Sequence, residues 1–302
     1  MDSKVLDVFD NGVHKLPFEV YKKIPRVHKS HLWTLQTSTP ARYKWEVEHD
    51  DDEATVAMIV GAATHAAVLE PQKFENDFIV APATASGGEI WNRRTTKHKE
   101  EWKAFEATAN GKTILTAEQY KLCQDLSASV RNHPTAKMFL DKIEPEQSLL
   151  WTDPSTQIDL KGRPDGIVAG AGIVIDLKTC ISAAPAAFKM VSYKFGYHFQ
   201  IAMYFDAMKA CGIEPKRAIF IAVEKTPPYC VAVYEAEADA LSLGRNQYQN
   251  ALRVLADCAA VNKWPGYDSG ILTLPLPTWA GTEEYGGGAF DYSEIAPMGE
   301  EK

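Results

Sequence analysis

The stretch that decides the fold runs from Gly162 to Lys178 and reads GRPDGIVAGAGIVIDLK. Two apolar runs flank a turn of glycine and alanine, which is the pattern of a β-hairpin. A loop centred on Gly170 and Ala171 sets Asp165 opposite Asp176. Directly opposed residues of an antiparallel pair hold their Cβ atoms roughly 4.5 to 5.5 Å apart, so two carboxylates placed in this way repel each other unless a cation neutralises them.

Alternation along the second strand predicts two different faces. Asp176 and Lys178 point to one side, while Ile175 and Leu177 point to the other side, toward a core. Two carboxylates and an ammonium group on one face suit phosphodiester hydrolysis, because carboxylates hold Mg²⁺ or Mn²⁺ and a lysine can orient or deprotonate a metal-bound water. The alternative is a surface ion pair, since a bare D-x-K pattern is common.

Further elements follow on both sides of the hairpin. A Thr116 cap with Gln119 three residues later marks the start of one helix. The patterns predict helices over 54–69, 99–111, 116–132, 182–210 with a break near Gly196, and 236–260, and strands over 148–153, 157–169, 172–179, 217–225 and 229–236. This order predicts an α/β (α+β) fold: a central mixed sheet flanked by helices, with an N-terminal helical elaboration.

The domain organisation follows from this order. With 302 residues and 45% hydrophobic content, we expect one domain over 1–280. Its N-terminal helical part covers about 1–140, and its sheet core about 141–260. The Gly-rich acidic tail over 281–302 is expected to be disordered.

The formal net charge of −8 argues against a protein whose whole surface binds nucleic acid. Contact with DNA then requires a local basic patch, and the segment 91–99 supplies one. Five of its nine residues are Arg, Lys or His. The candidate phosphate contacts in it are Arg93, Arg94, Lys97 and Lys99. The alternative for this segment is a solvated loop that leads into a helix.

The five cysteines are scattered and form no C-x-x-C pair, which argues against a disulfide framework and against a zinc or iron–sulfur site. We expect reduced, mostly buried thiols. No apolar stretch is long enough to span a bilayer and no secretory signal pattern is present. These features predict a cytoplasmic protein without a membrane partner.

The hairpin motif resembles a known family. GRPDGI followed by IDLKT is similar to the PD-(D/E)XK nucleases, and the chain from about Ser30 to Trp279 resembles the RecE-type exonucleases, the exodeoxyribonuclease VIII family of phages and prophages in the RecB-like branch. Other similar segments are GAATHAAVLEP at 61–71, EQS at 146–148 before Trp151, Q-x-x-x-Y at 200–204, EK at 224–225 before PY at 228–229, and WPGY at 264–267.

The resemblance implies a metal site around the hairpin. His65 lies among small residues, and without the resemblance it would be interpreted as a core histidine. The resemblance instead implies that it is a ligand of Mg²⁺ or Mn²⁺. Asp165, Asp176 and the backbone carbonyl of Leu177 complete the implied set. Glu146 is a further candidate ligand, with an exposed carboxylate as the alternative.

Gln200 and Tyr204 are four residues apart and so share one face of a predicted helix. Ordinary amphipathic packing explains this spacing equally well. The resemblance instead places both residues beside the active centre, where they position substrate or Lys178.

The activity implied by the resemblance is Mg²⁺-dependent exonuclease action on linear double-stranded DNA from the 5′ end. The resulting 3′ single strand would go to a phage annealing protein during recombination. The implied assembly is a ring-shaped homo-oligomer on DNA ends in the bacterial cytoplasm. The alternatives are a RecB-like single-strand or structure-specific endonuclease and a catalytically inactive DNA-binding protein of the same fold.

Overall fold

The computed structural model describes residues 9–49, 55–88, 91–92, 94–267 and 270–276. The chain divides into two compact units, Met1–Pro265 and Gly266–Lys302. The described residues of the second unit contain no helix or strand. The expected tail over 281–302 lies outside the described residues, and the domain boundary at 280 stays a prediction.

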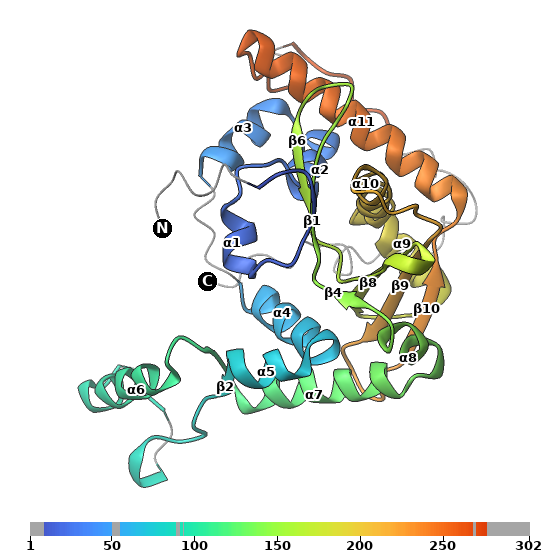
Figure 1. The fold of residues 1–302 in the computed structure, drawn as a ribbon. Helices are drawn as coiled ribbons and strands as arrows, with labels where there is room; N and C mark the ends of the chain where they lie inside the picture. Colours follow the sequence, from blue (N-terminus) through green and yellow to red (C-terminus); the bar gives the residue numbers. More distant parts are fainter. Residues whose placement is uncertain (1–8, 50–54, 89–90, 93, 268–269, 277–302) are drawn as a thin grey trace. The chain divides into compact units, whose positions relative to one another are not determined.

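A five-stranded mixed sheet forms the centre of the first unit (Figure 1). Its order is β10-β9-β8-β7-β4, and only the β8–β9 pair is parallel. The strands are β4 (Glu144–Pro145), β7 (Gly166–Val168), β8 (Ile173–Cys180), β9 (Arg217–Glu224) and β10 (Val231–Glu235). The predicted mixed sheet is therefore confirmed.

Two smaller sheets accompany the central one. The three-stranded sheet contains β1 (Gly12–His14), β5 (Ser148–Thr152) and β6 (Asp159–Gly162). The two-stranded sheet pairs β2 (Phe78–Val80) and β3 (Thr113–Leu115) in parallel. Between β2 and β3 the chain forms a 3₁₀ turn, Ser86–Gly88, and the helix α6 (Thr96–Ala109).

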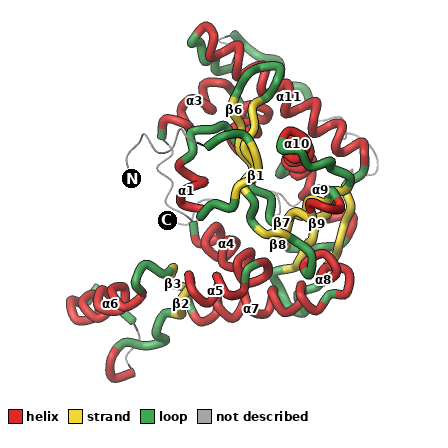
Figure 2. Tube along the Cα trace, in the orientation of Figure 1, coloured by secondary structure: helices red, strands yellow, loops and turns green. Residues whose placement is uncertain are grey.

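Helices cover both faces of the central sheet (Figure 2). The remaining ones are α1 (Phe18–Lys23), α2 (Lys29–Thr37), α3 (Pro40–Glu48), α4 (Val56–Leu69), α5 (Pro71–Asp77), α7 (Ala117–Asn132), α8 (Pro134–Leu140), α9 (Pro185–Lys194), α10 (Tyr197–Ala210) and α11 (Ala238–Val261). Side chains of α4, α7 and α8 pack on one face, and side chains of α10 and α11 pack on the other. None of the described helices is long and apolar enough to cross a membrane.

The predicted hairpin register is confirmed. Gly166 pairs with Ile175 and Val168 with Ile173, and the turn between the strands is the 3₁₀ turn Ala169–Ala171 followed by Gly172 at φ 67°. A Cβ on Gly172 would lie 2.2 Å from the Glu214 carbonyl oxygen, so only glycine fits there.

The single predicted strand over 157–169 is wrong. It forms two strands that belong to different sheets: β6 pairs with β5, and β7 pairs with β8 and β4. The break falls at Arg163–Asp165, where Pro164 has no amide hydrogen to donate to a strand ladder. This interruption leaves Asp165 just before β7, outside either ladder.

Several local predictions hold. The capping box of Thr116 and Gln119 is present at the start of α7. The helix break near Gly196 separates α9 from α10, and Gly196 takes φ 64° with the Trp33 ring 2.6 Å from where a Cβ would lie. All five cysteines are free thiols, and Cys123, Cys180 and Cys258 are buried.

Candidate active site

The candidate site lies at the start of β7, where β8 extends beyond its last residue paired with β7. The last β8 residue paired with β7 is Ile175, so the amide of Leu177 has no β7 partner. Asp165 replaces the missing strand: its Oδ2 accepts a 2.6 Å hydrogen bond from the Leu177 amide. Because β7 begins only at Gly166, the carboxylate of the preceding Asp165 reaches the backbone between Asp176 and Lys178.

Asp176 and Lys178 share the face of β8 that α10 covers. The Lys178 Nζ lies 2.6 Å from Asp176 Oδ2, although the angles are not those of a hydrogen bond. Gln200 on α10 joins the two residues: its Nε2 donates to Asp176 Oδ1 at 3.0 Å and its Oε1 accepts from Lys178 Nζ at 3.2 Å. The Gln200 Nε2 also contacts the Tyr204 hydroxyl at 2.9 Å. Gln200 and Tyr204 are thus brought to the carboxylates.

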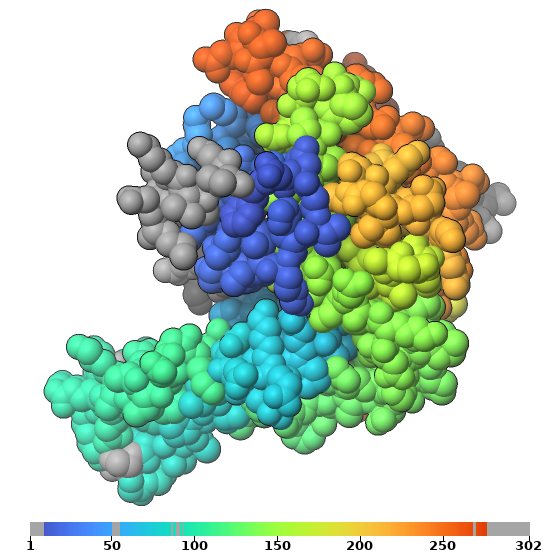
Figure 3. Space-filling model, in the orientation of Figure 1, coloured from blue at the N-terminus to red at the C-terminus, as the bar shows by residue number. Residues whose placement is uncertain are grey.

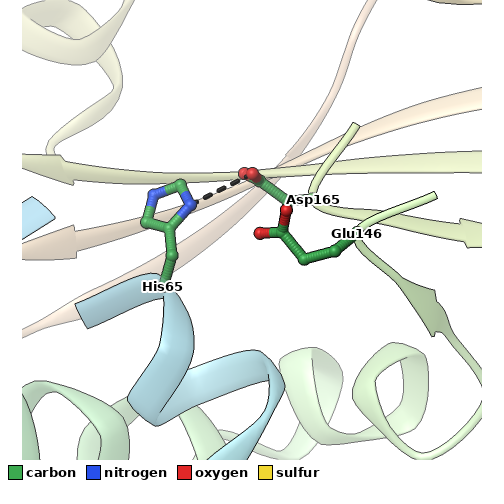
Figure 4. Close-up of side chains that lie close together, drawn as sticks. All are labelled: His65, Glu146 and Asp165. Carbon is green, nitrogen blue, oxygen red and sulfur yellow. Dashed lines mark hydrogen bonds and ion pairs between the residues drawn. The ribbon is translucent and has the colours of Figure 1, made fainter. Parts of the chain in front are cut away.

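His65 reaches the same place from α4, on the other side of the sheet. Its Nδ1 lies 3.0 Å from Asp165 Oδ1, and the Glu146 carboxylate lies beside both (Figure 4). One ligand atom from each of these three residues falls within 4.8 Å of the others. Among the described residues, this is the group of His, Cys, Asp and Glu side chains that could hold a metal ion.

Arg163 fixes Glu146, and sequence reasoning missed this role. The Arg163 Nε donates to Glu146 Oε2 at 2.5 Å, and Nη1 donates to Ser148 Oγ at 2.9 Å. The Glu146 amide donates to the Asp165 carbonyl at 3.1 Å, with Glu146 at φ 57°. This left-handed conformation in a non-glycine residue costs energy and is typical of functional sites. The position of Arg163 inside the GRPD motif is the sequence feature that could have predicted this role.

The pairing of His65 with Asp165 favours the charged form of each residue. Burial alone would lower the pKa of His65, but the Asp165 carboxylate outweighs burial and raises it above its ordinary value. Burial likewise opposes ionisation of Asp165, yet the His65 charge and hydrogen bond, Lys178 and the Leu177 amide together hold its pKa below the usual range. The Asp165 carboxylate thus favours protonated His65, whose positive charge offsets the charge of the carboxylate.

Asp176 and Lys178 respond differently. Burial raises the pKa of Asp176 above its usual value, and the Asp165 charge adds to this effect against the attraction of Lys178. Burial would lower the pKa of Lys178, but the two carboxylates outweigh it and raise that pKa. These surroundings favour the charged form of Lys178 and the neutral form of Asp176.

Two more residues adjoin Lys178 and were not predicted. The Lys178 Nζ lies 4.6 Å from the centre of the Tyr197 ring, at the start of α10. Lys29, at the start of α2, has its pKa lowered to about 8 by burial and by the charge of Lys178. Tyr197 lies three residues before Gln200, which is helical spacing, whereas nothing in the sequence singles out Lys29.

The donor set fits a divalent cation. Asp165 and Glu146 offer carboxylate oxygens beside His65. Asp176, outside this group of three, has one oxygen that is buried without a hydrogen bond. Hard oxygen ligands suit Mg²⁺ and Mn²⁺, whereas imidazole is also common around other transition metals. His65, Glu146 and Asp165 would hold the ion, with Asp176 as a further candidate ligand. The Leu177 carbonyl stays a predicted ligand.

The predicted DNA-contacting patch lies apart from this site. Arg94 lies just before α6, and Lys97 and Lys99 lie in its first turn; all three are exposed. Figure 1 shows α6 away from β8, and Figure 3 shows the teal surface of this segment at the lower left. Arg93 lies outside the described residues. The structure therefore does not bring the patch to the carboxylates, and its role in binding stays a prediction.

A family model and one solved structure agree with this architecture. A family described as a PDDEXK-like domain of unknown function (DUF3799) matches residues 29–273. A solved structure from Eubacterium rectale, described as a putative exonuclease, matches with a TM-score of 0.56 at 14% identity, covering 88% of this chain and 98% of that one. An alkaline exonuclease from Laribacter hongkongensis matches at 14% identity over 67% of this chain and 97% of its own, with a TM-score of 0.26. No curated protein matches significantly.

Proposed function

Since the chain belongs to the family of PDDEXK-like domains that matches residues 29–273, we propose that it is a divalent-metal-dependent deoxyribonuclease. The observation that carries this proposal is the convergence of Asp165, Asp176 and Lys178 at the start of β7. Two carboxylates and a lysine on adjacent positions of a sheet supply the groups that phosphodiester hydrolysis needs.

Each residue has a proposed part in the reaction. Asp165 and Asp176 hold the cation, with His65, Glu146 and the Leu177 carbonyl as additional ligands. The bound Mg²⁺ or Mn²⁺ would polarise the phosphate and lower the pKa of a bound water. Lys178 acts through its positive charge, which orients the water and the phosphate oxygens.

Gln200 and Tyr204 position these groups. Gln200 bonds both Asp176 and Lys178, and the Tyr204 hydroxyl donates to the Arg163 carbonyl at 3.2 Å. A Cβ on Gly162 would lie 3.1 Å from the Tyr204 ring, so glycine allows α10 to approach the end of β6. The contact links the chain just before Asp165 to the helix that carries Gln200.

The finer proposal is a RecE-type exonuclease. It degrades linear double-stranded DNA from the 5′ end and leaves a 3′ single strand for a phage annealing protein, for recombination in the bacterial cytoplasm. We further propose a ring-shaped homo-oligomer that holds the DNA end. The support for these points is the resemblance of the motifs around Asp165 and His65.

The test is digestion of linear duplex labelled at either 5′ or 3′ ends, with Mg²⁺, with Mn²⁺ and with EDTA. We expect metal-dependent early release of the 5′ label as a nucleotide, and no cutting of covalently closed circles. Asp165→Asn should abolish release, and Asp257→Asn, which changes an exposed carboxylate on α11, should leave it unchanged.

The other outcomes separate the alternatives. Nicking of circles or of single strands would indicate a RecB-like endonuclease, and an intact 5′ label during early digestion would contradict the proposed polarity. Binding of DNA without release in any metal would overturn the nuclease proposal in favour of an inactive DNA-binding protein.

A further inference from the structure

An aromatic surface begins at the catalytic lysine and leads to solvent. The Tyr197 ring lies under the Lys178 ammonium, with 4.6 Å between Nζ and the ring centre. The Phe195 ring stacks beside the Tyr197 ring, with centroids 6.2 Å apart and planes 23° apart. Phe195 is 50% exposed, which is unusual for a phenylalanine so close to a candidate active site.

A second exposed ring lies two residues earlier, on the same joint between α9 and α10. Tyr193 is 62% exposed and stacks on the buried His198 ring, at 5.4 Å and 10°. Each exposed ring is therefore backed by a ring from α10. Because Gly196 lies against Trp33, the joint that carries both rings is held firmly. Firmly held rings lose little conformational freedom when a ligand stacks on them.

The charge around these rings favours an anionic ligand. Lys194 Nζ lies 5.7 Å from the Phe195 ring centre, and Lys29 Nζ donates to the Phe195 carbonyl at 2.8 Å. Lys189 is exposed on the same helix. Helix α9, PAAFKMVSYK, contains no acidic residue, although the whole chain has a net charge of −8. This surface thus combines lysines with exposed aromatic rings in an otherwise acidic protein.

We propose that Phe195, with Tyr193, forms a stacking platform for unpaired bases of the DNA strand whose phosphate lies at Lys178. The proposal rests on the proposed nuclease function for the identity of that strand. Phe195 contacts Tyr197, which in turn contacts Lys178. Successive bases of a stacked strand are about 3.4 Å apart. The first few nucleotides beside a phosphate at Lys178 can therefore reach Phe195. Aromatic stacking accepts every base, so the platform holds single-stranded DNA without sequence preference.

The platform also explains how a duplex end presents one strand to a recessed site. A paired base has its faces covered by its neighbours, whereas a base that stacks on Phe195 must leave the duplex. Lys29 and Lys194 lie where the phosphates of such an unstacked strand would need neutralisation. The platform is thus a strand-separating surface beside the carboxylates, and it binds DNA independently of the metal.

The experiment measures binding of a fluorescently labelled oligothymidylate to the full-length protein in EDTA, which prevents cleavage. Phe195→Ala should weaken binding about 5- to 150-fold, the range for loss of one base–aromatic stack. The matched control is Phe18→Ala, which removes a 51% exposed phenylalanine on α1 and should change binding less than about twofold.

Two further measurements separate stacking from a structural role. Phe195→Trp should restore binding, and Phe195→Leu, which keeps an apolar side chain but no ring, should not. An oligonucleotide with abasic sugars should bind wild type and Phe195→Ala equally, because its backbone carries no base to stack. Equal binding of the thymidylate to both proteins, or equal loss on the abasic strand, would overturn the platform.

The two proposals fail in distinguishable ways. Absence of metal-dependent cleavage in wild type would remove the nuclease function and leave the binding result untouched. With an active enzyme, Phe195→Ala should raise KM for single-stranded substrate more than it lowers kcat, whereas a variant of Asp165 loses kcat. A kcat loss alone in Phe195→Ala would contradict the platform.

Discussion

Alternate side chains of β8 enter two different environments, although they are buried to the same extent. Ile175 and Leu177 are fully buried on the face covered by α4 and α7, and Asp176, on the opposite face, is 1% exposed. Burying each aliphatic chain contributes roughly 1.5–3 kcal/mol to stability, whereas burying a carboxylate is unfavourable unless it is paired. One strand therefore carries the stability on one face and the chemistry, at a cost in stability, on the other.

The largest expected effect is on activity, from Asp176→Asn. The substitution keeps the shape of the side chain but removes the charge that would hold the metal, so we expect cleavage to fall by about a thousandfold or more. Because burial raises the pKa of Asp176, its ionised form opposes folding, and the metal-free variant should be at least as stable as wild type. Nuclease assays and thermal unfolding in EDTA measure the two quantities.

Added Mn²⁺ provides the control for this variant. Binding of the ion to the folded state should raise the Tm of wild type, and this increase should be small or absent in Asp176→Asn. A strongly destabilised Asp176→Asn would show that the Asp176–Lys178 pair stabilises the fold. It would contradict the inference that only the Ile175 and Leu177 face of β8 contributes stability.

The next effect is on stability, from Ile175→Ala on the opposite face. Removal of this buried side chain leaves a cavity between the sheet and the helices α4 and α7, and we expect a loss of about 2–5 kcal/mol in the free energy of unfolding. Activity per folded molecule should change little, since the carboxylates lie on the other face. Urea unfolding and the specific activity of the folded fraction test this; an activity loss as large as that of Asp176→Asn would contradict it.

The two faces of β8 could be predicted because the information is local. A two-residue alternation separates Asp176 from Leu177, and the small-residue turn sets the register that pairs Val168 with Ile173. The capping box at Thr116 and the break at Gly196 are equally local. These features depend on neighbours within a few residues, so the sequence alone was sufficient.

The other residues of the site come from distant segments of the chain, and local sequence patterns could not predict that they meet there. His65 and Asp165 are 100 positions apart, and only the family resemblance brought His65 to the metal site. The approach of Lys29 to Lys178 has no local signal at all. The prediction of one continuous strand over 157–169 was wrong. Apolar alternation persists across Arg163–Asp165, but Pro164 interrupts the strand there, and its two halves pair in different sheets.

A smaller effect is the pH dependence of metal affinity. His65 must lose its proton to bind a metal, and the Asp165 carboxylate raises its pKa above 6.5. Apparent Mn²⁺ affinity should therefore fall about tenfold per pH unit below that raised pKa. The fall should steepen at lower pH, where Asp176, with its own raised pKa, also binds a proton. Titration calorimetry over about pH 5–9, a range that includes the ordinary histidine pKa of about 6.5, measures this.

His65→Gln supplies the control for the pH profile. Without the imidazole, the decline near neutral pH should disappear and only the decline due to Asp176 should remain. In the metal-free wild type, the His65–Asp165 ion pair stabilises the fold at low pH and is lost as pH rises through the raised pKa of His65. Metal affinity that is flat between neutral and acidic pH would exclude His65 as a ligand.

The smallest expected effect belongs to the start of α6, far along the chain from both faces of β8. If Arg94 and Lys99 contact phosphates, replacing both with alanine should reduce the slope of log affinity against log salt by about 1–2, with a few-fold weaker duplex binding near 0.15 M salt, about the physiological value. The pair Lys209→Ala and Lys216→Ala, also exposed, makes the same change in net charge and should leave the slope unchanged. Because attachment and chemistry occupy different elements, kcat should stay at the wild-type value in both double variants. An altered kcat with an unchanged salt slope would mean that α6 acts on the carboxylates of β7 and β8 through the fold and not on the DNA.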